Sequence, residues 1–199
     1  AAVPPARIAV VEPPCPPLAR AHGSSGRETT IVSQSELASE SDRVVLLTAL
    51  AGLLDLDWRL SVIGDRGTNT DCSTELARRL GGRVTVTDQS DRARCEALWL
   101  GADIFASADA GPGYGMAIAA ALKRGLPAAI CRDKAGTPEV PPEAGAAAPP
   151  GDHVQLAKAL RRLLFDRDLR REMAEAAFRC GQSLPESGAV AQQLASALG

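Results

Sequence analysis

Short apolar runs alternate with longer stretches of helical periodicity along most of this chain. The apolar runs are four to six residues long and cover 29–33, 58–63, 83–87, 102–107, 128–131 and 144–148. Runs of this length and composition are typical of buried strands. Apolar residues at helical spacing predict helices over 39–55, 71–80, 91–100, 116–124, 152–165 and 166–180, followed by a last helix over 187–198.

Strands that alternate with helices of this length predict an α/β fold. We expect a Rossmann-like, mainly parallel sheet with helices on both faces and additional C-terminal helices. Right-handed crossovers place the loops that follow the strands along one edge, where open sheets of this kind bind their ligands. The first helix is expected to bury a face formed by Val44, Leu47, Leu50 and Leu54.

Proline and glycine mark the expected boundaries of the domain. The Pro-rich run 12–17 cannot form a helix, and His22–Gly26 is interpreted as a flexible connector. We therefore expect residues 1–28 to be an interdomain linker that enters from another domain. Residues 29–182 are expected to form the Rossmann-like domain, and residues 183–199 a helical extension after the break at Pro185.

A glycine-rich turn, Gly111–Gly115, leads directly into the helix expected over 116–124. Such a turn lets a ligand approach the backbone, and the N–H groups and positive dipole end of the helix favour a phosphate or diphosphate. The alternative is a tight strand-to-helix turn without a ligand. The helix is apolar on nearly every face and should be buried, with Lys123 and Arg124 covering its end.

Composition narrows the classes of partner and site. The net charge is −2, aromatic residues make up 3% of the chain and no basic block occurs, which argues against nucleic-acid binding. No apolar run approaches the ~18 residues of a transmembrane helix. The five cysteines, at positions 15, 72, 95, 131 and 180, never form a Cys-x-x-Cys pair. We therefore expect no metal site, no disulfide framework and a reducing, cytoplasmic setting.

Seven segments occur in a fixed order along the chain: 6–11, 60–65, 98–105, 113–115 with 125–127, 135–140, 149–152 and 156–164. In this order they resemble the C-terminal domain of the two-domain, GT-B type glycosyltransferases, specifically the retaining group 1 (family 4) enzymes. The resemblance covers residues 8–177. It implies a domain over 29–182 that binds a UDP-, GDP- or ADP-sugar as substrate, with no cofactor, and an absent N-terminal domain that binds the acceptor.

The resemblance also assigns residues to the donor site. Those expected to hold the distal phosphate are Gly113, Tyr114, Gly115, Met116 and Ala117. Those expected beside the nucleotide are Gly64, Asp65, Thr87, Asp88 and Glu139.

Four positions depart from the family's pattern. The family places glutamates at the positions of Pro112 and Ala120, one near the transferred sugar and one on the ribose hydroxyls. It places an arginine and a lysine against the diphosphate at the positions that align with Glu36 and Ser41. The motif is therefore degenerate and no catalytic residue is assigned. Each lost charge-assisted bond is worth roughly 1.5–3 kcal/mol, so we expect UDP, GDP and ADP to bind only at millimolar concentrations.

Two hypotheses on function follow. In the first, the chain is the donor-binding domain of a retaining transferase that moves a hexosyl group to an unknown acceptor, and it is weak or inactive without the other domain. In the second, it is a non-catalytic GT-B-like domain that serves as an assembly or regulatory partner. Whether a sugar nucleotide binds at all separates the two.

Overall fold

In the computed structural model, which describes residues 13–34, 40–64, 76, 79–109, 115–132 and 139–198, six strands form one sheet. The strand order is β3-β2-β1-β4-β5-β6, and every neighbouring pair is parallel. The strands are β1 (Thr29–Gln34), β2 (Trp58–Gly64), β3 (Val84–Asp88), β4 (Ile104–Ser107), β5 (Ala128–Cys131) and β6 (Gly145–Ala148). The predicted α/β fold with a parallel sheet is confirmed.

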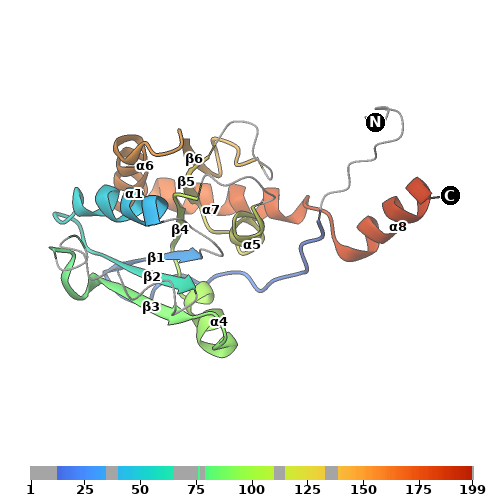
Figure 1. Cartoon of the computed structure of the whole chain (residues 1–199), viewed down its shortest axis with the longest axis horizontal. Helices are drawn as coiled ribbons and strands as arrows, with labels where there is room; N and C mark the ends of the chain where they lie inside the picture. Colours follow the sequence, from blue (N-terminus) through green and yellow to red (C-terminus); the bar gives the residue numbers. More distant parts are fainter. Residues whose placement is uncertain are drawn as a thin grey trace.

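Helices cover both faces of this sheet (Figure 1). Their bounds are α1 (Glu40–Ala51), α4 (Arg92–Leu100), α5 (Met116–Lys123), α6 (His153–Phe165), α7 (Arg167–Gln182) and α8 (Ser187–Leu198). Adjacent strand residues point to opposite faces, so Ile31 packs with α1 and α6, whereas Val32 packs with α4, α5 and α7. The helix expected over 71–80 lies mostly outside the described residues.

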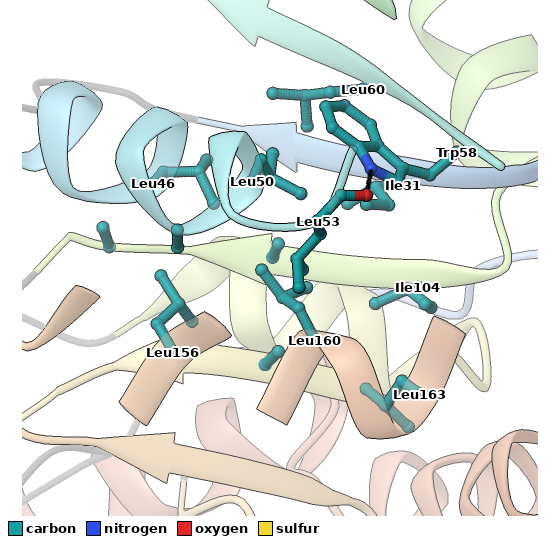
Figure 2. Packing of buried hydrophobic residues seen from close by; sticks show 14 of the residues in the cluster. Ile31, Leu46, Leu50, Leu53, Trp58, Leu60, Ile104, Leu156, Leu160 and Leu163 are labelled. Carbon is teal, nitrogen blue, oxygen red and sulfur yellow. Dashed lines mark hydrogen bonds between the residues drawn. The ribbon is translucent and has the colours of Figure 1, made fainter. Parts of the chain in front are cut away.

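The core under α1 and α6 is built from leucines around one tryptophan (Figure 2). The indole of Trp58 is fully buried, and its Nε1 donates a hydrogen bond of 2.8 Å to the carbonyl oxygen of Leu53. Because a buried indole N–H needs an acceptor, this bond fixes the turn that follows α1 against the start of β2. Residues of β1, β2 and β4 complete the cluster from the side of the sheet.

The buried face of α1 differs from the predicted one. Leu47 and Leu50 are buried as expected, but Val44 and Leu54 are 43% and 39% exposed. The buried positions are instead Leu46, Leu47, Ala49, Leu50 and Leu53. The helix ends at Ala51, so helical spacing no longer holds at Leu54, and the face that meets the sheet starts at Leu46 rather than Val44.

The helix α5 is buried, as its apolar composition predicts. Ile118, Ala119, Ala121 and Leu122 are inaccessible or nearly so. Gly181 of α7 permits close packing, because a methyl group there would collide with the backbone of Leu122. Gly125 follows with a φ of +72°, a value that favours glycine and ends the helix.

Lys123 and Arg124 do not cover the end of α5 as expected, because both are buried. Lys123 is 1% exposed, and its Nζ lies 3.4 Å from Oε1 of Glu186, just before α8. Arg124 donates two hydrogen bonds of 2.8 and 2.6 Å to the Glu96 carboxylate on α4. A buried cation needs such partners, and here they come from distant parts of the chain.

The segment before β1 is hydrogen-bonded to the domain, so the expectation of a flexible connector is wrong for its first residues. The amide of Ala21 donates to the carbonyl of Arg124 at 2.9 Å, and that of His22 to the carbonyl of Leu100 at 2.9 Å. Asp103 accepts hydrogen bonds from the amides of Ser24 and Thr30. The assignment of residues 1–28 as an interdomain linker stays a prediction.

The described helices include none that combines the length and the apolar composition needed to cross a membrane.

Candidate functional site

The carboxyl ends of β1, β2, β3, β4 and β5 lie at the same edge of the sheet, because all of these strands run in parallel. The helix α5 begins at this edge, after β4. The structure describes Ser41, Gly64, Thr87, Asp88, Gly115, Met116, Ala117, Ala120 and Glu139 among the predicted site residues. The predicted residues Glu36, Asp65, Pro112, Gly113 and Tyr114 lie outside the described residues.

A cleft of about 460 Å³ lies at this edge between α4, α5 and the segment at residues 15–18. Met116 and Ala117, predicted beside the phosphate, line it together with Ala120. The ends of three strands also contribute, through Gln34, Ile63 and Gln89. The cleft therefore joins the start of α5 to the loops where the resemblance places the nucleotide.

The N-terminus of α5 is suited to an anion. Gly115 is its N-cap residue and no side chain caps the helix. The first turn contains no acidic residue. The first amide N–H groups of a helix have no intrahelical acceptor and carry the positive end of its dipole. The positive end of α5 is therefore not neutralised by a side-chain cap or by an acidic residue of its first turn.

Arg132 is the residue at this site that sequence reasoning missed. It follows β5 directly, and its amide donates to the carbonyl of Ala148 at 2.9 Å. Its guanidinium lies against Gly115: a methyl group on Gly115 would collide with Nη1 of Arg132. A cation thus lies at the N-cap of α5, in close contact with the backbone of Gly115. The one sequence signal was its place after an apolar strand that ends at the carboxyl edge.

The loop after β3 is held by its own hydrogen bonds. The amide of Gln89 donates to the carbonyl of Gly64 at 3.1 Å, which joins the ends of β2 and β3. The Asp88 carboxylate accepts from the amide of Ser90 at 2.9 Å, and Asp91 caps α4 by accepting from the amide of Arg94. Thr87 is buried. Of these residues Gln89 lines the cleft, whereas Gly64, Thr87 and Asp88 are not among its lining residues.

Carboxylates are scarce in the cleft. Ala120 stands where the resemblance expects a ribose-binding glutamate, and the lining acid Glu96 is paired with Arg124. The ring of Trp99 lies 5.5 Å from the same guanidinium.

The remaining predicted residues that the structure describes are exposed. Ser41 lies at the start of α1, on the same edge of the sheet as the cleft. Glu139 is exposed. Burial is the main cause that raises the pKa of Cys180 on α7, and the charges of Glu143 and Glu139 raise it further.

The described cysteines are not activated as nucleophiles. Burial is the main cause that raises the pKa of Cys15, Cys95, Cys131 and Cys180. Cys15 and Cys95 line the cleft, but a thiol must lose its proton to attack a substrate. Nucleophilic attack by these thiols is therefore disfavoured in the cleft.

The chain matches a family model over residues 17–179, and the description of that model is "Glycosyl transferases group 1". The match contains all six strands of the described sheet and the cleft residues from Leu18 to Arg124. The comparison with curated protein sequences returns no match.

Several solved structures share this fold. Sucrose-phosphate synthase from Thermosynechococcus elongatus has a TM-score of 0.68 at 22% identity, over 85% of this chain and 44% of that chain. Anabaena HepE in complex with UDP-glucose has a TM-score of 0.69 at 22% identity, over 86% and 48%. The C-terminal domain of LpcC, a group 1 protein from Francisella tularensis, has a TM-score of 0.65 at 18% identity, over 84% and 95%. The chain thus spans less than half of each of the first two proteins.

Proposed function

Because this chain belongs to the group 1 glycosyl transferases, we propose that the carboxyl edge of its sheet binds the nucleoside diphosphate of a nucleotide-sugar donor. The observation that carries the proposal is the uncapped N-terminus of α5 with the Arg132 guanidinium against Gly115. Backbone amides and a guanidinium together form a site for phosphate oxygens. HepE, which shares the fold, was solved with UDP-glucose, so UDP is the first nucleotide to test.

In this proposal the two parts of the ligand meet different surroundings. The diphosphate lies at Gly115, Met116 and Ala117, where the amides of α5 and Arg132 attract it. The nucleoside extends into the cleft toward Gln34 and Gln89, whose side chains offer both donors and acceptors. Ala120 provides no carboxylate for the ribose hydroxyls, so the nucleoside is held less firmly than the phosphates.

The affinity follows from these contacts. One charge-assisted contact from Arg132 and the dipole end of α5 together contribute roughly 2.5–4 kcal/mol. This sum corresponds to a dissociation constant on the order of 1 mM or weaker. We therefore propose a weak donor site, in which Arg132 replaces one of the two cations that are absent from the segment containing Ser41.

Transfer of the sugar is proposed to need a second domain. The chain spans less than half of sucrose-phosphate synthase and of HepE, and its cleft is open at the carboxyl edge, where an acceptor-binding domain would close it. We propose hexosyl transfer with retention for the two-domain protein and expect none from these 199 residues alone. Turnover of a UDP-sugar by the purified chain, measured as acceptor glycosylation, would contradict this.

Calorimetric titration with UDP, GDP and ADP tests the donor site. We expect Arg132→Gln to weaken binding roughly tenfold or more, because one charge-assisted contact is lost. Arg162→Gln removes the same charge from an exposed position on α6 and should leave the affinity unchanged. Ala120→Glu should tighten binding, because a carboxylate then faces the ribose. Equal weakening by both arginine variants, or micromolar binding by the unaltered chain, would overturn the proposal.

A further inference from the structure

A second cavity, of about 200 Å³, lies at the opposite edge of the sheet from the donor cleft. It adjoins the residues that precede β4 and β5, and its walls come from the segment at 21–24, from 102–103, from 125–126 and from the start of α7. A water molecule occupies about 30 Å³ in the liquid, so the cavity has room for an ion of several heavy atoms. The residues that line the donor cleft and the residues that line this cavity do not overlap.

Three arginines of α7 line this cavity: Arg167, Arg170 and Arg171. Their spacing of i, i+3 and i+4 places all three on one face of the helix. Asp168 falls outside this pattern. The arginines also lie in the first turns of α7, where the positive end of the helix dipole adds to their charge. We call this face of α7 and the cavity that it lines the α7 arginine site.

The acid in the cavity wall is already engaged. Asp103 accepts hydrogen bonds from the amides of Ser24 and Thr30, at 3.1 and 2.8 Å, one on each carboxylate oxygen. Asp166, which precedes α7, accepts from the amide of Leu169 and caps the helix. Within the described part of the chain, the side chains of Arg167 and Arg171 form no hydrogen bond and no ion pair. The charge of the site is therefore only partly compensated.

Arg170 is the arginine of this site that is removed most from water. It is half-buried, and its Nη1 donates to the carbonyl of Leu163 at 2.6 Å. Burial lowers the pKa of Arg170, and the charges of Arg167 and Arg171 lower it further, against the opposing effect of Asp103 and Asp166. An anion between the guanidinium groups would supply a counter-charge to the buried cation and offset the repulsion among the three arginines.

We propose that the α7 arginine site binds a phosphate group, which Arg167, Arg170 and Arg171 hold beside the segment at 21–24. Guanidinium groups match phosphate oxygens in geometry as well as in charge. The phosphate belongs either to a soluble phosphate compound or to a lipid headgroup. Because residues 21–24 form one wall, an occupied site would hold the segment before β1 against α7. The proposal does not depend on donor binding, which concerns the other edge of the sheet.

Titration of the full chain with inorganic phosphate, followed by amide chemical shifts, tests the soluble source. We expect saturable shifts at Gly23, Ser24 and Arg171. Arg167→Gln with Arg171→Gln should weaken binding roughly tenfold or more. The matched control, Arg162→Gln with Arg179→Gln, removes the same charge from exposed positions outside the cavity and should leave the affinity unchanged. Both substituted arginines of the site are exposed, and equal thermal midpoints would show that folding is intact.

Vesicle flotation tests the lipid source, with phosphatidylcholine alone and with added phosphatidic acid. Binding only to the acidic vesicles, lost in the double variant of the site and kept in the control, would assign the phosphate to a lipid. Phosphate binding without vesicle binding would assign it to a soluble compound. The proposal is overturned if neither binds, if the control variant is weakened as much, or if phosphate shifts only Gly115 and Met116 at the donor edge.

Discussion

At the scale of single residues, Arg124 holds three parts of the molecule together. Its guanidinium is 4% exposed, is paired with Glu96 on α4 and donates to the carbonyl of Ala19 at 3.2 Å. It thereby connects the end of α5, the middle of α4 and the segment before β1. The loss of its carboxylate partner would leave a buried cation without its counter-charge.

We expect Glu96→Gln to destabilise the fold measurably. Loss of a partner costs about 3–5 kcal/mol in a buried pair and about 0–1 kcal/mol in an exposed one. Glu96 is 47% exposed while Arg124 is buried, so we expect about 1–3 kcal/mol, between these limits. Urea denaturation measures the loss. Glu28→Gln is the matched control, because the Glu28–Arg59 pair is exposed on both sides; an equal effect of both substitutions would contradict the account.

Cys131 should make stability depend on alkaline pH. Burial raises the pKa of its thiol from 9.0 to about 11, and the charges of Asp152 and Asp42 contribute. The native state thus favours the neutral thiol, so its stabilising effect is complete below pH 9 and is lost as the pH rises toward 11. We expect the unfolding free energy of the unaltered chain to fall more steeply over this interval than that of Cys131→Ala. Parallel pH profiles from urea denaturation would contradict this.

Residue-level features were the hardest to predict from the sequence. The burial of Lys123 and Arg124 depends on Glu186 and Glu96, which are 63 and 28 positions away. The place of Arg132 depends on the approach of β5 to the start of α5, which no local pattern encodes. Asp103 was not predicted to bind the segment before β1. Each of these partners is brought together only by the tertiary fold.

At the scale of elements, side-chain caps fix where helices begin. Asp152 precedes α6, and its carboxylate accepts from the amides of Val154 and Gln155 at 3.1 and 2.9 Å. The α6 leucines then face the core beside α1 (Figure 2). The register of this helix relative to the core therefore depends on a bond at its first turn.

Asp152→Ala should lower the unfolding free energy by about 1 kcal/mol, within the range of about 0.5–2 for the loss of an N-cap. Asp152→Asn keeps an acceptor oxygen, so its unfolding free energy should fall by only a few tenths of the loss expected for Asp152→Ala. Denaturant unfolding of both variants at neutral pH measures the difference. Equal losses in the two variants would show that the charge, rather than the cap, stabilises α6.

Element positions followed from sequence periodicity, whereas the buried face of α1 did not. The strand and helix bounds lie close to the predicted ones because strands are short apolar runs and caps such as Asp91 and Asp152 are local. In α1, apolar residues occupy more than one face, so several stripes fit the pattern equally. Contact with α6 and the sheet selects the stripe that starts at Leu46, and that contact cannot be read locally.

At the scale of the whole molecule, the parallel sheet separates two edges for which we propose different ligands. The carboxyl edge carries the proposed donor cleft, and the amino edge carries the α7 arginine site. The alternation of strands and helices was enough to predict the fold and the edge at which α5 begins. It was not enough to predict a second cavity. The packing of α7 against α5 brings the arginines of α7 next to the segment at 21–24, and no local pattern in the sequence encodes this packing.

Amide chemical-shift mapping with UDP tests the central claim most directly, because it locates the nucleotide as well as detecting it. We predict fast-exchange shifts that rise to millimolar UDP, largest at Gly115, Met116 and Ala117 and extending to Gln34 and Gln89. Arg132→Gln should reduce them strongly. A chain that shows no shifts at the start of α5, or shifts confined to the amino edge of the sheet, would contradict the proposed donor site.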